Sequence, residues 1–191
     1  MNIRPIKKSF VFQFNDDVTS NGEFDNGTTA GGIILQSSFD DSAKQARWVT
    51  IVAAGNDCDD VVFHPGAQVL LPALRWTEAS KFEGQKIWKS DETQVVAYKD
   101  GDVVVPIQNY VIFTQNKANV SQSQSGLLVV VGGVGDTASG IVVSVGSDAA
   151  EELQVGYKIL YDDANFNDTF EHGGVKYAFI KDESIFAYEP N

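Results

Sequence analysis

Short runs of β-forming residues cover most of this chain, and they constrain its fold more than any other feature. The runs are rich in Val, Ile, Phe and Tyr and are separated by Gly, Asp, Asn and Pro, which favour turns. Only two short segments, 39–47 and 147–154, have a helix-like composition. The pattern therefore predicts an all-β protein of the barrel or sandwich type. The predicted strands are 10–14, 48–54, 68–74, 93–98, 102–106, 109–115, 126–131, 140–145, 157–161, 175–180 and 184–189.

Four blocks of sequence recur in the same order in the two halves of the chain. Each pair shares a Gly, Pro or Asp at a matching position, as Pro5 and Pro106 or Gly55 and Gly146 do. Four ordered matches favour an internal duplication over chance. We therefore expect two domains, residues 1–105 and residues 106–191. The matched blocks are 4–14 with 105–115, 49–57 with 141–148, 64–72 with 154–162, and 94–105 with 176–187.

Composition narrows the classes of partner and compartment. The chain has 191 residues, of which 43% are hydrophobic, and its net charge is −12. This negative charge argues against binding to nucleic acid and to anionic membranes. No apolar run reaches the ~18 residues of a membrane helix. The start, MNIRPIKKSF, has no apolar stretch of signal-peptide length, and the single Cys58 permits no internal disulfide. We expect a cytoplasmic protein.

Two motifs imitate ligand sites without completing them. Residues 132–138, GGVGDTA, resemble a dinucleotide fingerprint, but the sequence that follows is strand-like, whereas the fingerprint needs a helix. Residues 163–168, DANFND, resemble the start of a calcium loop. Their sixth position is Asp168 and their twelfth is Gly174, where the loop needs Gly and Glu. We expect no nucleotide and no metal at either motif.

The remaining chemistry-bearing residues also lack a catalytic pattern. His64 and His172 are the only histidines, and with Cys58 they show no zinc spacing. A Cys58–His64 dyad is conceivable, but a turn position and a strand-start position explain these residues better. No nucleophile elbow is present. We expect the protein not to be an enzyme, with no catalytic residues and no cofactor. Trp48, Trp76 and Trp88 are expected in a core or an interface.

One apolar triplet does not fit the strand pattern. Ile33, Ile34 and Leu35 follow Gly31 and Gly32, and polar or small residues flank them on both sides. The glycines let the chain turn sharply, and the flanks favour a solvated segment. The triplet is either a docking motif for another protein or one more core strand.

The repeated blocks resemble the co-chaperonin (GroES, chaperonin-10) family. MNIRP resembles the family's start, AGGIIL resembles its mobile loop, and VTIVAAGN resembles the strand after that loop. HPGAQVLLP and QVGYKILYD resemble the next strand, and YAFIKDESIFAYE resembles the C-terminal strand pair. Between Gly55 and Gly66, and between Gly146 and Gly156, there is no room for the roof hairpin of bacterial members. In this respect the chain resembles the family's bacteriophage relatives.

The resemblance implies a fold and a function. The fold would be two tandem GroES-like small β-barrels, with a mobile-loop-like segment at 26–47. The protein would be a homo-oligomeric co-chaperonin that caps the folding chamber of a GroEL-like chaperonin, with Ile33, Ile34 and Leu35 as docking residues behind Gly31 and Gly32. The second copy has only one glycine in SQSGLLVVV, so its docking candidates are weaker; they are Leu127, Leu128 and Val129.

Simple energetics agree with docking by several loops together. Burying three aliphatic side chains yields roughly 1.5–3 kcal/mol each, whereas ordering a loop costs about 1–2 kcal/mol per residue. A single loop would bind weakly, and a ring of loops would bind through effective concentration. The alternative is a structural protein, a virion assembly or decoration component, that uses the fold without binding a chaperonin. The location would be the host cytoplasm for a phage co-chaperonin and the virion for the alternative.

Overall fold

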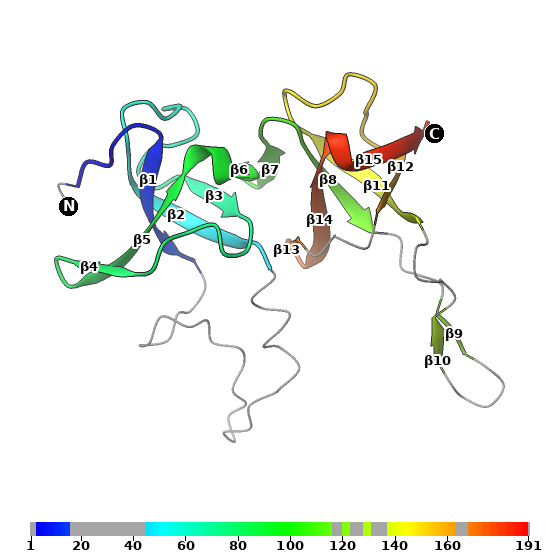
Figure 1. The fold of residues 1–191 in the computed structure, drawn as a ribbon, viewed down its shortest axis with the longest axis horizontal. Helices are drawn as coiled ribbons and strands as arrows, with labels where there is room; N and C mark the ends of the chain where they lie inside the picture. Colours follow the sequence, from blue (N-terminus) through cyan, green and yellow to red (C-terminus); the bar gives the residue numbers. More distant parts are fainter. Residues whose placement is uncertain are drawn as a thin grey trace. The chain divides into compact units, whose positions relative to one another are not determined.

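The structure is a computed structural model that describes residues 3–15, 45–115, 120–122, 128–130, 137–162 and 168–190 (Figure 1). In these residues the regular structure consists of β-strands and single turns of 3-10 helix, which confirms the predicted all-β class. The helix-like segment 147–154 forms turns instead, closed by hydrogen bonds from Ala149 N to Gly146 O and from Leu153 N to Ala150 O, and Leu153 packs in the core of the second unit. In the part of the chain that the structure describes, no helix could span a membrane.

The chain divides into two compact units, Met1–Val105 and Pro106–Asn191. The first unit contains a seven-stranded sheet with the order β4-β5-β1-β2-β3-β6-β7. A 3-10 turn, η1 (Glu92–Gln94), joins β5 to β6. The strands are β1 (Ser9–Phe14), β2 (Arg47–Ala54), β3 (Gln68–Leu71), β4 (Ser80–Phe82), β5 (Gln85–Asp91), β6 (Ala97–Asp100) and β7 (Val103–Pro106).

The second unit contains a six-stranded sheet with the order β13-β14-β8-β11-β12-β15 and a separate pair of strands, β9 and β10. The turn η3 (Asp182–Ser184) joins β14 to β15. The strands are β8 (Tyr110–Gln115), β9 (Val120–Gln122), β10 (Leu128–Val130), β11 (Thr137–Val145), β12 (Lys158–Asp162), β13 (Thr169–His172), β14 (Val175–Lys181) and β15 (Ile185–Glu189).

The two sheets have the same strand order, apart from β7 at the end of the first. The six matching strands run β4, β5, β1, β2, β3, β6 in one unit and β13, β14, β8, β11, β12, β15 in the other. In neither order do the described end strands pair with each other, so the predicted closed barrels are not confirmed. The connections 55–67 and 146–157 contain turns and no strand.

A β-bulge occurs at the same place in both sheets. Between β1 and β2, Val11 pairs with Ala53 and Phe12 pairs with Ile51, so Val52 is an extra residue. Between β8 and β11, Phe113 pairs with Val142 and Ile112 with Ser144, which leaves Val143 extra in the same way. A bulge bends and twists its strand locally, so both sheets carry the same distortion.

The repeated glycines have a steric reason. Gly55 donates its N–H to Ser9 O at 2.9 Å, and Gly146 donates to Tyr110 O at 2.9 Å. A Cβ on Gly55 would collide with the carbonyl oxygen of Lys7, and a Cβ on Gly146 would collide with that of Gln108. Lys7 and Gln108 themselves have positive φ values, 53° and 54°. The backbone of the residues before the first strand therefore leaves no room for a side chain.

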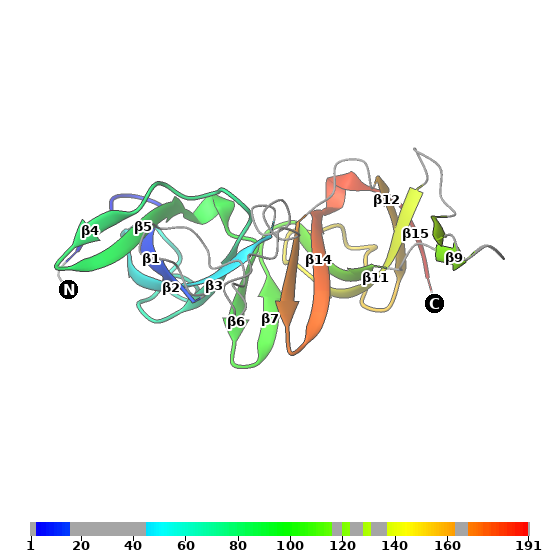
Figure 2. The same ribbon diagram turned by 90° about the horizontal axis from the view of Figure 1, so that it is seen from below.

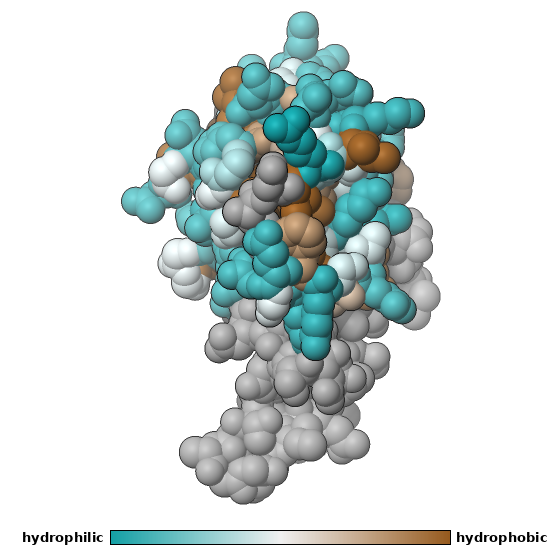
Figure 3. Space-filling model, turned by 90° about the vertical axis from the view of Figure 1, so that its left-hand side faces the viewer, coloured by the Kyte–Doolittle hydropathy of each residue, from teal (hydrophilic) through white to brown (hydrophobic). Residues whose placement is uncertain are grey.

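Each unit has its own apolar core. In β1, Phe10 and Phe12 are fully buried and Val11 between them is partly exposed, as the two-residue period of a strand requires. The second core consists of Val111, Phe113, Val142, Leu153, Ile159, Tyr161, Ala178 and Ile180. On the face in Figure 3, hydrophilic residues predominate and hydrophobic ones form small separate patches.

The fourth predicted block pairing is wrong in register. The segment β14-η3-β15 occupies the same place in its sheet as β5-η1-β6, so residues 176–187 correspond to 86–97 rather than to 94–105. Strand β5, QKIWKSD, was not predicted because its charged residues interrupt the apolar pattern, and only Ile87, Trp88 and Ser90 are buried.

Candidate functional site

Both sets of predicted docking residues lie in the connection between the same two strands of their unit, β1 and β2 in the first and β8 and β11 in the second. Residues 31–35 lie outside the described residues, between β1 and β2, and the described chain ends at Asn15 and resumes at Gln45. Of the weaker candidates, Leu127 lies outside the described residues, whereas Leu128 and Val129 begin β10 and pair with Gln122 and Ser121 of β9. These strands lie between β8 and β11, which is the connection equivalent to β1–β2. The docking role of both sets stays a prediction.

Two hydrogen bonds close the base of the β1–β2 connection. The N–H of Asn15 donates to Trp48 O at 3.1 Å, and Thr50 Oγ1 donates to Asn15 Oδ1 at 2.6 Å. The last residue described before the connection is thus tied to the strand that follows it. No sequence pattern marks this contact, because it depends on the register of two strands.

An aromatic cluster lies under the same base. Phe14, the last residue of β1, packs edge-on against Trp76 at 5.0 Å and against Trp88 at 4.8 Å between ring centroids. Phe12 contacts the rings of both Phe14 and Trp88. Such pairs contribute about 0.5–1.5 kcal/mol each beyond burial. They hold the end of β1 firmly, and they place Trp88 in the core, as expected from the sequence.

In the second unit, a buried tyrosine has the corresponding role. Tyr161 in β12 is 1% exposed and packs against Phe113 with a centroid distance of 4.9 Å. Gln115, the last residue of β8, donates from Nε2 to the Tyr161 hydroxyl at 3.3 Å. Both connections therefore start from a strand end fixed by aromatic packing and polar contacts.

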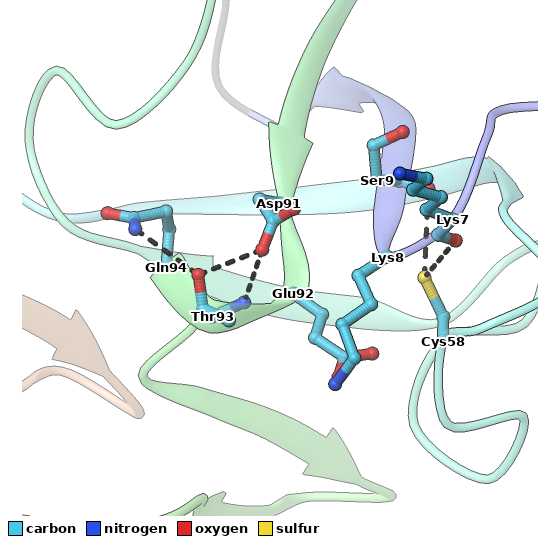
Figure 4. Close-up of polar contacts among 8 residues, drawn as sticks. All are labelled: Lys7, Lys8, Ser9, Cys58, Asp91, Glu92, Thr93 and Gln94. Carbon is cyan, nitrogen blue, oxygen red and sulfur yellow. Dashed lines mark hydrogen bonds and ion pairs between the residues drawn. The ribbon is translucent and has the colours of Figure 1, made fainter.

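A second polar cluster lies where β1 begins (Figure 4). Lys8 Nζ forms an ion pair with Glu92 Oε1 at 2.7 Å, and this hydrogen bond raises the pKa of Lys8. In the second unit, Asn109 Nδ2 donates to Asp182 Oδ1 and the N–H of Ala150 donates to Asp182 Oδ2, both at 2.9 Å. In each unit a carboxylate from the 3-10 turn thus holds the residue before the first strand.

Cys58 belongs to this cluster and is not set up as a nucleophile. Its Sγ lies 3.6 Å from Ser9 O and 3.8 Å from Lys7 O (Figure 4). Burial raises the pKa of the Cys58 thiol, which is the opposite of what activates a catalytic cysteine. The ring of His64 is occupied elsewhere, with Nδ1 3.2 Å from Pro65 O. Packing explains Cys58 without a dyad.

The two motifs that imitate ligand sites can be followed only in part. Residues 132–136 and 163–167 lie outside the described residues. The residues after the glycine motif form strand β11, so the helix that a dinucleotide site needs does not follow. Within the described ranges, no three His, Cys, Asp or Glu side chains come together as a potential metal site.

Comparison with known families gives a match that covers the second unit and the last strand of the first sheet. Residues 103–188 match the model of the family described as Chaperonin 10 Kd subunit. The match begins at β7 and ends in β15, so it includes every strand of the six-stranded sheet. No curated protein matches the chain. The match supports the resemblance inferred from sequence for this part of the chain: residues 103–188 are similar to the co-chaperonin family.

Proposed function

We propose that this protein is a co-chaperonin that caps a chaperonin folding chamber through the apolar triplet Ile33, Ile34 and Leu35. The observation that carries the proposal is the match of residues 103–188 to the chaperonin-10 family. A chaperonin ring of the GroEL type is the partner, and any ATP hydrolysis belongs to that partner. The protein acts as an oligomer, because docking by one triplet is weak.

The first unit is a diverged tandem copy of the second. Three features support this: the common strand order, the bulge at Val52 and Val143, and the crowded glycines Gly55 and Gly146. The strand-free connections 55–67 and 146–157 support a bacteriophage-like member without a roof hairpin.

Docking through the β1–β2 connection fits the geometry of its base. Asn15, Thr50 and the Phe14 cluster hold the strand ends in place, so partner binding at the triplet need not rearrange the sheet. Burying three aliphatic side chains yields at most about 9 kcal/mol before ordering costs. Those costs are of similar size, so repetition of the triplet around an assembly supplies the net affinity.

The test is co-migration of the protein with a GroEL-like chaperonin in the presence of nucleotide. Ile34→Ser should abolish co-migration, and its melting temperature should stay close to that of the wild type, because the side chain serves the partner. Gln36→Ser, a control next to the triplet, should co-migrate normally. A melting temperature reduced by many degrees in Ile34→Ser would show that the triplet is a core strand, whose truncation costs roughly 2–5 kcal/mol.

A structural role in virion assembly or decoration is the second candidate. This role is favoured by the strand pairing of Leu128 and Val129 in β10 with Gln122 and Ser121 in β9, because these candidate docking residues then pair within their own chain. In this case the protein would form assemblies and show no nucleotide-dependent binding to a chaperonin.

A further inference from the structure

The turn that follows β3 carries an exposed leucine in a backbone conformation that leucine rarely adopts. Leu74 has a φ of 61° and is 73% exposed. Glycine is the usual residue at positive φ, and a bulky side chain there is strained. The sequence thus keeps an apolar side chain in water at a position where glycine would cause less strain. Strain of this kind is typical of residues that serve a contact outside the fold.

Leu74 lies at the end of the sheet from which the β1–β2 connection leaves. Arg47, the first residue of β2, pairs with Leu71, the last residue of β3, so the turn continues past the end at which β2 begins. Strands β1, β2 and β3 lie side by side (Figure 2). Trp76, two residues after Leu74, packs against Phe14 at the end of β1 with a centroid distance of 5.0 Å. The turn therefore adjoins the base of the connection that contains residues 33–35.

Hydrogen bonds hold the residues after Leu74 onto β5. Ser90 Oγ donates to Arg75 O at 2.6 Å, and Ser90 is itself 7% exposed. The N–H of Thr77 donates to Lys89 O at 2.9 Å, and the N–H of Lys89 donates to Thr77 Oγ1 at 3.2 Å. Together with the packing of the neighbouring tryptophan, these bonds fix the backbone that presents Leu74. The leucine is therefore an ordered apolar projection.

We propose that Leu74 is a second docking residue, which becomes buried against an apolar surface of the chaperonin next to the place where the triplet at 33–35 binds. The proposal rests on the proposed function and adds a contact to it. An ordered residue loses less conformational entropy on binding than a loop that must be ordered. The burial gain of the triplet is largely offset by that ordering cost, whereas Leu74 retains most of the gain from its own burial.

Two substitutions separate the side chain from the strain. Leu74→Ser removes the apolar side chain and leaves a residue at positive φ, whereas Leu74→Gly removes the side chain and the strain. Both should raise the Kd for immobilised GroEL-like chaperonin in the presence of nucleotide at least about tenfold, which corresponds to about 1.4 kcal/mol. Leu74→Gly should nevertheless unfold at a urea concentration no lower than that of the wild type. Weaker binding without a loss of stability is the behaviour expected where strain serves function.

Val61 provides the matched control. It is 76% exposed, and it belongs to the connection 55–67, which joins β2 to β3 at the opposite end of these strands. Val61→Ser removes a comparably exposed aliphatic side chain from the same unit, so it should bind the chaperonin as the wild type does. A loss of binding shared by Val61→Ser and Leu74→Ser would reflect general surface hydrophobicity and would overturn the inference.

A fluorescent label tests the contact directly and does not depend on the effect of a truncation. Leu74→Cys and Val61→Cys are prepared in a Cys58→Ala background, checked for native circular dichroism and labelled with a dansyl group. Addition of chaperonin and nucleotide should shift the dansyl emission to shorter wavelength at residue 74, because the label enters an apolar environment. The label at residue 61 should not respond.

The outcomes distinguish this inference from the proposed function. A wild-type protein that binds the chaperonin, together with a Leu74→Ser variant that binds equally well, would refute the second contact and leave the proposed function standing. A label at residue 74 that does not respond, in a protein that binds, would do the same. A wild-type protein that does not bind the chaperonin would refute both.

Discussion

Replacing Gly55 with alanine should destabilise the first unit through a collision that the structure locates. The new Cβ would overlap Lys7 O and would lie 2.9 Å from Lys7 C and 3.0 Å from Ile6 C. All three are backbone atoms, so no flexible side chain can move aside. Gly55 is not among the residues with positive φ, so alanine pays no conformational penalty there. Forced overpacking of this kind costs typically 1–3 kcal/mol.

Urea unfolding followed by tryptophan fluorescence measures this cost in the first unit, because Trp48, Trp76 and Trp88 all precede residue 106. The free energy of unfolding falls by about 2 kcal/mol per molar of urea, so a loss of about 2 kcal/mol in stability lowers the urea midpoint by about 1 M. The matched control is Gly146→Ala, whose Cβ would collide with Gln108 O in the second unit. It should lower the midpoint seen by circular dichroism and leave the fluorescence midpoint nearly unchanged. An unchanged fluorescence midpoint for Gly55→Ala would refute the steric argument.

Two further predictions concern the cluster before the first strand. Asp182→Ala removes the acceptor of two hydrogen bonds, from Asn109 Nδ2 and Ala150 N, and should cost about 1–3 kcal/mol by circular dichroism in urea; a loss below about 0.5 kcal/mol would contradict the role given to this carboxylate. Because burial raises the pKa of Cys58, the folded state favours the neutral thiol, so this contribution to stability is complete below the ordinary thiol pKa and is lost as pH rises through the folded value. Alkylation of Cys58 at pH 8 should accordingly be much slower in the native protein than in urea, and equal rates would refute its burial.

The apolar strands could be predicted from sequence because burial of one or both faces leaves a clear pattern. β1, β8 and β14 follow runs such as FVFQF and VKYAFI closely. β4 was missed because all three of its residues are exposed, so nothing apolar marks it. The segment 147–154 looked helical from its Ala and Glu, but its place between β11 and β12 requires turns.

The candidate site was less accessible to prediction. The triplet at 33–35 was found by its contrast with polar flanks, and its role awaits the binding experiment. The contacts that fix the base of the connection, such as Thr50 with Asn15 or Gln115 with Tyr161, join residues far apart in sequence. These contacts depend on the register in which the strands pair. A single sequence does not specify that register when several apolar strands could pair with one another.

The fixed strand ends have a consequence for how such a protein can evolve. Since Asn15 and Gln115 are held by contacts within their own sheets, insertions between Phe14 and Arg47, or between Gln115 and Thr137, need not shift either sheet. Doubling the length of a flexible connection costs only about 0.6 kcal/mol of closure entropy. Each unit can therefore lengthen or shorten this connection, while the sheet that carries it stays under separate selection.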